Sequence, residues 1–357
     1  NEDFNGLMEL LRGLIDESIK TPDADTRKTI ISDLMDQYHR FLITPIAPAL
    51  ADKKEVIFFP DGILNFLPFE AIQPKGGQYL IERMDIRYGR SADVSAALQA
   101  RQYADNRKSF LGMGGAEYNK MGIYDQIDRK NINYNYLKIQ AAKNTQQGIS
   151  QRRIYGSLFG EKMNYLAGTL KEVTNLSQIF DDATVYKGTE MTENLIKELS
   201  KTGKLREYKI VHLATHGFSL PDFPELSGIA MTIFPDERNG EDGYLTAPEI
   251  SQLDMNADLV VLSACETALG KIYGGEGVAG LLQSILEGGA KSALVSLWPV
   301  NDAGTMYFMT GLYQLTEREG KSYDDAVNIM KREFISGKFG EFFQDPKIWA
   351  PFIHYGY

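Results

Sequence analysis

Between Glu55 and about residue 336, short apolar runs alternate with segments whose apolar residues recur at helical spacing. Strands that alternate with helices in this way predict a mostly parallel sheet covered by helices on both faces, which is an α/β fold. Chemistry in such sheets gathers beyond the carboxyl ends of the strands. The residues that follow each predicted strand are therefore the first candidates for a functional site.

The same patterns place the expected elements. Strands are predicted over 56–59, 109–113, 183–186, 209–214, 229–233, 258–263 and 292–297. Helices are predicted over 170–179, 192–200, 277–288, 303–317 and 322–336, the last with Ser322 and Asp325 at capping-box spacing. Upstream, residues 1–48 read as a hairpin of two helices that Pro45 ends. This hairpin is either a packing element of the domain or the last unit of an upstream helical repeat array.

Composition excludes several classes of function. Of 357 residues 43% are hydrophobic, which suffices for a large core and two subdomains, and the net charge of −10 argues against direct binding of nucleic acid. The single cysteine excludes an internal disulfide and a thiolate-rich metal site, and it suits the reducing cytoplasm. No apolar run approaches the roughly 18 residues of a membrane span, and we expect no membrane association. A chain that starts at Asn1 is expected to be a fragment of a longer protein.

Two predicted strands each end in a residue that could carry nucleophilic chemistry. The run Ile210–His216 ends in an imidazole, and the run Asp258–Cys265 ends in the only thiol. A thiol becomes a good nucleophile when a nearby base takes its proton, and histidine is the usual base. The backbone N–H groups of Gly217 and Cys265 then form an oxyanion hole. The residues alone leave one alternative, in which Cys265 is a buried core residue.

Two further patterns fit cofactor chemistry poorly. His212 and His216 have H-x-x-x-H spacing, but a zinc site of this type needs a helix and a glutamate where Leu213 stands. The glycines of Gly275–Gly280 match G-x-G-x-x-G, but they lie about ten residues beyond the predicted strand, whereas a dinucleotide site needs them directly after it. We therefore expect no metal and no cofactor, and a nucleotide-binding oxidoreductase is the weakest alternative.

Asp302 follows the predicted strand 292–297 and falls on the same edge of the sheet as His216 and Cys265. Its carboxylate either binds a basic substrate side chain or caps a helix that begins near Ala303. The residues alone favour the cap.

Several of these segments together resemble the CHAT family of caspase-like peptidases. They run in the family's order from about residue 50 to 356, and they are Phe59–Phe69, Val211–Gly217, Leu262–Thr267, Gly274–Leu281, Ser296–Asp302 and Trp349–Phe352. The resemblance implies a caspase-like three-layer sandwich with a mostly parallel sheet, preceded by the helical hairpin. It also implies that His216 is the catalytic base and Cys265 the nucleophile of a cysteine endopeptidase.

The resemblance further implies a domain organisation. A helical hairpin over 1–48 would precede a peptidase domain over 49–357. Within that domain, 55–115 would be a pseudo-protease part, 119–160 an insertion loop and 165–357 the catalytic part. The insertion carries the dibasic pair Arg152–Arg153, which is either an autoprocessing site or part of a spacer.

Separase, a related peptidase, has a similar Trp-x-Val-x-Asp stretch whose aspartate receives a basic P1 residue, and this aspartate falls on Asp302. The resemblance therefore implies cleavage after Arg or Lys, with Trp298 and Glu276 as further substrate-binding residues. The expected partners are a protein substrate and an upstream repeat region or regulatory complex, in bacterial signalling or defence. Gasdermin-like proteins and CRISPR-associated factors are substrates within the family. The main alternative is a catalytically silent scaffold with the same fold.

Overall fold

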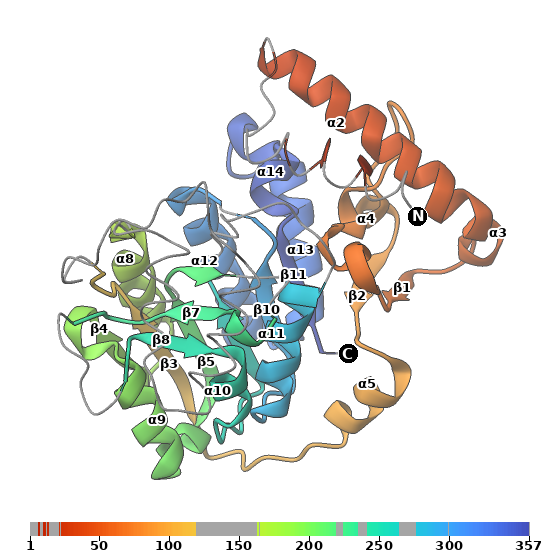
Figure 1. Ribbon diagram of the computed structural model, residues 1–357. Coiled ribbons are helices and arrows are strands. Elements are labelled where there is room, and N and C mark those ends of the chain that lie inside the picture. Colours follow the sequence, from red (N-terminus) through yellow and green to blue (C-terminus); the bar gives the residue numbers. More distant parts are fainter. Residues whose placement is uncertain are drawn as a thin grey trace, which may run out of the picture. The chain divides into compact units, whose positions relative to one another are not determined.

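The computed structural model separates the chain into two compact units (Figure 1). Unit 1 combines both ends of the chain, Asn1–Gln102, Lys271–Val278 and Ser292–Tyr357, whereas unit 2 holds the middle, Tyr103–Gly270 and Ala279–Lys291. The structure describes residues 6–7, 10–11, 13, 21, 23–118, 163, 165–218, 224–234, 241–263, 276–298 and 300–356. Most of the first predicted helix and the segment 119–160 with Arg152 and Arg153 lie outside these residues.

Unit 2 contains four parallel strands in the order β9-β5-β3-β4. They are β9 (Leu259–Leu262), β5 (Tyr208–Ala214), β3 (Lys108–Gly114) and β4 (Thr184–Lys187). Strand β5 is paired on both edges, and α8 (Ala167–Leu176) packs against β3, β4 and β5 (Figure 1). A strand paired on both edges and covered in this way is buried, which explains its nearly continuous apolar sequence.

The rest of unit 2 completes the surroundings of these strands. The helices are α9 (Glu193–Lys201), α10 (Ala247–Ser251) and most of α11 (Glu276–Glu287), with 3-10 turns at Ser177–Ile179, Gly188–Glu190, Lys204–Glu207 and Pro224–Leu226. A small antiparallel sheet of β6 (Gly217–Phe218), β7 (Gly228–Ala230) and β8 (Tyr244–Thr246) begins three residues after the end of β5.

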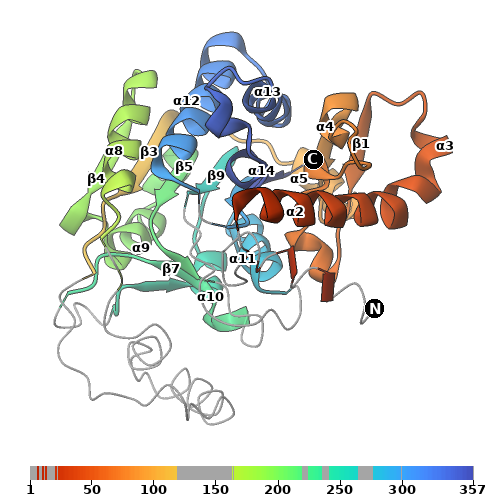
Figure 2. The same cartoon turned by 90° about the horizontal axis from the view of Figure 1, so that it is seen from above.

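Unit 1 contains the strands β1 (Glu55–Phe58), β2 (Asp85–Tyr88), β11 (Phe352–Tyr355) and β10 (Ala293–Ser296). The first three are parallel, and β10 pairs antiparallel with β11. The long helices α12 (Asp302–Glu319) and α13 (Tyr323–Ile335) lie side by side (Figure 2). Shorter helices are α4 (Leu80–Arg83), α5 (Ala92–Gln99) and α14 (Pro346–Trp349), with 3-10 turns at Gly62–Phe66, Phe69–Ala71 and Glu341–Gln344.

The expected helix end at Pro45 was wrong. Helix α2 (Ala24–Tyr38) passes into a π-helical turn at His39–Ile43, a 3-10 turn at Thr44–Ile46 and α3 (Ala47–Leu50). Pro45 lies in the first turn of the 3-10 segment, where a missing backbone N–H costs nothing. The helical path therefore continues past the proline with a change of hydrogen-bonding pattern.

The α/β class and the mostly parallel pairing were confirmed, as was the start of α13 at Ser322, whose hydroxyl accepts the Asp325 N–H at 3.1 Å. The predicted strand 229–233 is shorter, because the N–H groups of Met231, Thr232 and Ile233 bind carbonyls outside the strands. The short strands β2, β6, β8 and β11 were not predicted. Among the described residues, no helix is both long and apolar enough to cross a bilayer.

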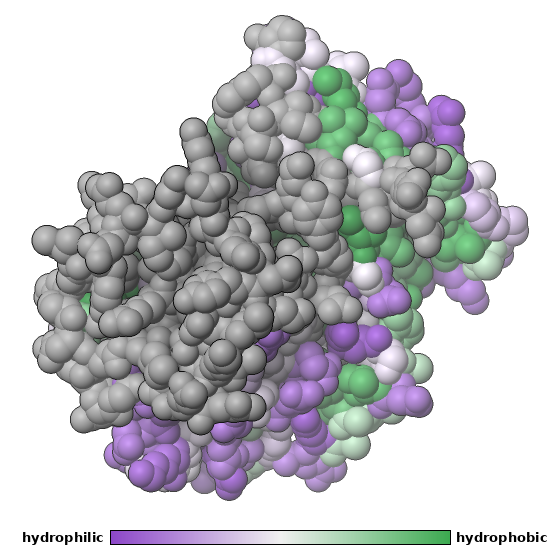
Figure 3. All heavy atoms as spheres, viewed as in Figure 1, coloured by the Kyte–Doolittle hydropathy of each residue, from purple (hydrophilic) through white to green (hydrophobic). Residues whose placement is uncertain are grey.

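Hydrophobic residues also reach the surface of unit 1, on the part of the face near α2 and α3 (Figure 3). Phe41 is 62% exposed and Phe59 is 44% exposed. The segment from Phe41 to Leu50 carries no charged residue.

Candidate active site

His216 lies two residues beyond the carboxyl end of β5 and immediately before β6. It is only 3% exposed. Its carbonyl accepts the Ala230 N–H at 2.8 Å, so the chain turns from the parallel strands directly into the small antiparallel sheet. Gly217 is the first residue of that sheet and pairs with Ile229. The position predicted for the base, at the carboxyl edge of the parallel strands, is the position that the structure describes.

Tyr118 and Thr215 surround the backbone of His216. The Tyr118 ring meets the His216 imidazole at 4.8 Å between centroids, with an interplanar angle of 62°. The Tyr118 hydroxyl lies 2.5 Å from Thr215 Oγ1 and accepts the backbone N–H of His216 at 3.4 Å. The Thr215 hydroxyl in turn donates to the carbonyl of Ala230. Neither residue was predicted from the sequence, although Tyr118 follows a predicted strand end as His216 does.

A buried carboxylate joins the strands that lead to His216 and Cys265. Glu172 Oε1, on α8, accepts a hydrogen bond from His212 Nε2 at 3.0 Å and another from Ser263 Oγ at 2.5 Å. His212 is fully buried on β5, so it is a structural residue, and no metal ligand set forms around it among the described residues. Its pairing with a carboxylate could not be read from the sequence, because Glu172 lies 40 residues away.

Cys265 itself lies outside the described residues, but the strand before it does not. Leu262, the last residue of β9, pairs with Leu213 of β5, and the Ser263 N–H donates to the Leu213 carbonyl at 3.0 Å. Leu213 precedes His216 by three residues, and Leu262 precedes Cys265 by three. The two chain segments that carry the candidate dyad therefore leave neighbouring strands in the same register.

The predicted substrate-binding residues are in part described. Asp302 is the exposed first residue of α12, and the helix is capped by Asn301, whose side-chain oxygen accepts the Gly304 N–H at 2.7 Å. The cap that the sequence favoured at Asp302 is therefore one residue earlier. Glu276 begins α11, and its side chain lies outside the described part.

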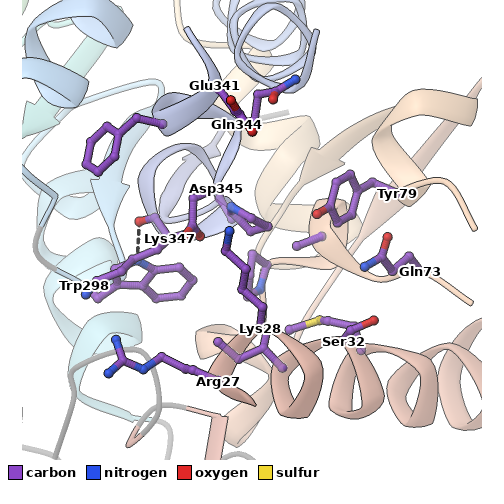
Figure 4. A pocket seen from close by; sticks show the side chains of 17 residues that line it. Arg27, Lys28, Ser32, Gln73, Tyr79, Trp298, Glu341, Gln344, Asp345 and Lys347 are labelled. Atoms are coloured by element: carbon purple, nitrogen blue, oxygen red, sulfur yellow. Dashed lines mark hydrogen bonds between the residues drawn. The ribbon is translucent and has the colours of Figure 1, made fainter. Parts of the chain in front are cut away.

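Trp298 is 7% exposed and donates its indole N–H to the Lys347 carbonyl at 2.9 Å. It lines a cavity of about 660 Å³ in unit 1, between α2 and the segment that holds α14 (Figure 4). Lys28 reaches into this cavity from α2, and Tyr79 faces it from the other side. Trp298 thus has a packing role in unit 1 beside its predicted role in substrate binding.

Unit 1 also contains a buried ionic network. Lys331 Nζ donates to Glu70 Oε1 at 2.5 Å, and Tyr88 donates to the other oxygen of Glu70. Burial lowers the pKa of Lys331, although Glu70 opposes the shift. Burial and Glu70 together raise the pKa of Tyr88 well above its usual value. The network joins segments far apart in sequence and is fully enclosed, which indicates a structural role.

His354 had no obvious partner in the sequence, and the structure supplies one. Its Nδ1 lies 2.7 Å from Asp324 Oδ1 on α13. Burial alone would raise the pKa of Asp324, but His354 and then Arg87 outweigh it and hold the pKa below its usual value.

One group of carboxylates in unit 2 has the spacing of a metal site. Glu193, Glu241 and Glu249 approach one another, but Lys197 Nζ lies among them at 2.7, 2.5 and 2.8 Å. Burial and the neighbouring carboxylates raise the pKa of Glu193 to about 9. The lysine supplies positive charge to these oxygens, and its contacts tie α9 to Glu241 and to Glu249 of α10.

A family model described as CHAT domain matches residues 33–357. The chain belongs to the CHAT domain family. The resemblance seen in the motifs is thereby confirmed, and the matched region begins within α2.

Curated relatives of this CHAT domain include tetratricopeptide repeat protein 28 of Mus musculus, 31% identical over 112 residues, and that of Homo sapiens, 31% identical over 143 residues. These matches cover 31% and 40% of this chain but only 4% and 5% of the relatives, so the chain spans a small part of their length. Similar solved structures include the Saccharomyces cerevisiae separase–securin complex, with a TM-score of 0.41, 14% identity and coverage of 82% of this chain and 15% of that chain. The Arg-specific cysteine proteinase gingipain R has a TM-score of 0.46, 11% identity and coverage of 95% and 69%.

Proposed function

We propose that this CHAT domain is a cysteine endopeptidase in which His216 is the base and Cys265 the nucleophile. The observation that carries the proposal is the buried position of His216 beyond β5, in register with the segment that leads to Cys265. Membership of the family supports the assignment, because the resemblance of the segments around His216 and Cys265 to the family's motifs implies these two roles.

The proposed reaction has two steps. His216 takes the thiol proton, the Cys265 sulfur bonds to the substrate carbonyl carbon, and the N–H groups of Gly217 and Cys265 stabilise the oxyanion. The amide C–N bond then breaks, and the leaving amine takes the proton from His216. In the second step, water gives a proton to His216 and its oxygen attacks the acyl carbon. The thiolate leaves and takes the proton back from His216, and the acid product is released.

We further propose that Asp302 receives a basic P1 side chain, assisted by Trp298 and Glu276. Asn301 already supplies the side-chain cap of α12, so the exposed Asp302 carboxylate is not needed as the cap. A carboxylate of this kind pairs well with a guanidinium, which favours Arg over Lys.

The proposed setting is a regulated pathway of the cytoplasm, with a protein substrate and an upstream repeat region or partner complex as regulator. The tetratricopeptide names of the relatives support a repeat-containing context. The hairpin over 1–48 and the peptidase domain over 49–357, with parts at 55–115 and 165–357, remain the proposed organisation. Bacterial signalling or defence is the proposed role.

The test is cleavage of a peptide library varied at P1, combined with labelling by a thiol-reactive peptide probe. Wild type should cleave after Arg or Lys and take the label, and Cys265→Ala and His216→Ala should lose cleavage. Asp302→Asn should slow cleavage after Arg by about 100-fold, because the bound Arg would lose its charged partner. Glu319→Gln, an exposed carboxylate at the other end of α12, is the matched control and should have no effect. Failure of wild type to cleave or to take the label would overturn the proposal and leave the silent scaffold.

A further inference from the structure

Tyr118 is held in one orientation by a chain of hydrogen bonds. The Thr215 hydroxyl has one proton, and it donates that proton to the Ala230 carbonyl. Tyr118 must then donate its own proton to Thr215 Oγ1, at 2.5 Å, because two hydroxyls cannot both be acceptors in one hydrogen bond. The Tyr118 oxygen keeps lone pairs that accept the His216 N–H at 3.4 Å. Each of the three groups thus has a defined role, and Tyr118 is only 3% exposed.

The same arrangement determines where the Tyr118 ring lies. Its ring packs edge-on against the His216 imidazole at 4.8 Å, and its hydroxyl reaches past the imidazole to the backbone of the same histidine. The torsion that turns an imidazole about its Cβ–Cγ bond has broad minima, so a histidine without lateral contacts samples many ring planes. A ring packed at this distance restricts that torsion.

We propose that Tyr118 is a positioning residue that restricts the ring plane of the His216 imidazole, the proposed base of the reaction. The inference rests on the proposed function of the dyad. Proton transfer requires heavy atoms within about 2.6–3.2 Å. A displacement of about 1 Å costs on the order of 100-fold in rate. The ring restricts the imidazole, and the hydroxyl holds the backbone from which the imidazole projects.

The single cysteine allows a direct test, because alkylation by iodoacetamide at neutral pH reports on Cys265 alone. The His216→Ala variant should be alkylated much more slowly than the wild-type protein. Tyr118→Leu, which removes the ring, should slow it by about 10- to 100-fold. Tyr118→Phe, which keeps the ring and loses the hydroxyl, should slow it only several-fold.

The decisive measurement repeats both changes in the His216→Ala background. If Tyr118 acts through His216, Tyr118→Leu has no further effect there, and the double-mutant cycle shows full coupling. An equal loss in both backgrounds would show a merely structural role and overturn the inference, as would unchanged alkylation in Tyr118→Leu. If His216→Ala itself leaves alkylation unchanged, the proposed dyad fails instead.

A second variant covers the case in which Tyr118→Leu does not fold. Thr215→Val keeps the shape of the side chain but removes the acceptor of the Tyr118 proton. It should slow alkylation several-fold with His216 present and not at all with His216→Ala. Loss in both backgrounds would again contradict the positioning role.

Discussion

The chain beyond β5 carries the proposed base and the chain beyond β10 carries the proposed recognition carboxylate, and the two ends are built in opposite ways. Beyond β5, His216 is buried and its backbone and ring are held by Tyr118 and Ala230. Beyond β10, Asp302 is exposed on the first turn of α12 and its neighbour Asn301 forms the cap. The first arrangement suits a group whose position must not change, and the second suits a group that meets an incoming side chain.

The largest effect is expected from removing Glu172, because its carboxylate holds β5 to the segment after β9. Glu172→Ala leaves the buried N–H of His212 and the Ser263 hydroxyl without their acceptor. We expect the free energy of unfolding to fall by about 3 kcal/mol. We also expect slower alkylation of Cys265, because Ser263 lies two residues before it. Thermal unfolding measures the first effect, and Glu172→Gln, which keeps an acceptor oxygen, should lose markedly less. Equal stability of Glu172→Ala and wild type would show that the carboxylate does not hold the two strands.

A smaller effect sharpens the comparison at the end of β10. Asn301→Ala removes the helix cap and should lower the free energy of unfolding by about 1 kcal/mol. Asp302→Ala removes only a charge near the start of the helix and should cost about 0.5 kcal/mol. Cleavage after Arg should show the reverse order, with the larger loss in Asp302→Ala. If stability and cleavage fall together in both variants, Asp302 has a structural role alone.

The smallest expected effect is the pH dependence of the stability that Asp324 contributes to unit 1. The pKa of Asp324 lies below its usual value, so its ionised form stabilises the folded state at neutral pH. This contribution is fully present above the usual value of about 4 and is lost as the pH falls through the lowered pKa. The difference in free energy of unfolding between wild type and Asp324→Asn should therefore shrink when the pH is lowered from 7 to 3. A difference that stays constant would show that the ionised form of Asp324 contributes nothing to stability.

Local hydrophobic patterns in the sequence predicted the longer strands of the fold but not the shortest ones. The strands β3, β5 and β9 were predicted because each is a buried apolar run between turn residues, and His216 was found by its place after β5. Strands of two or three residues, such as β6 and β8, have no period to detect. The cap was misplaced by one residue because Asn301 and Asp302 are both good capping residues.

The contacts around His216 could not be predicted from the sequence, because they depend on tertiary structure. Tyr118 lies 98 residues before His216, and Glu172 lies 91 residues before Ser263. Apart from its place after a predicted strand end, nothing local distinguishes Tyr118 from the other 18 tyrosines of the chain. A polar or aromatic residue just past a predicted strand end is the one signal that would have selected it.

The division of the chain between the units has a consequence for synthesis on the ribosome. Unit 2 is almost continuous in sequence, so it can fold as soon as residues up to Lys291 have emerged. Unit 1 needs both ends of the chain, because Glu70 and its partner Lys331 are separated by 261 residues in the sequence. The half with the candidate base is therefore ready before the half with the candidate recognition carboxylate. A nascent chain that stops short of α13 would have a folded His216 region and no completed unit 1.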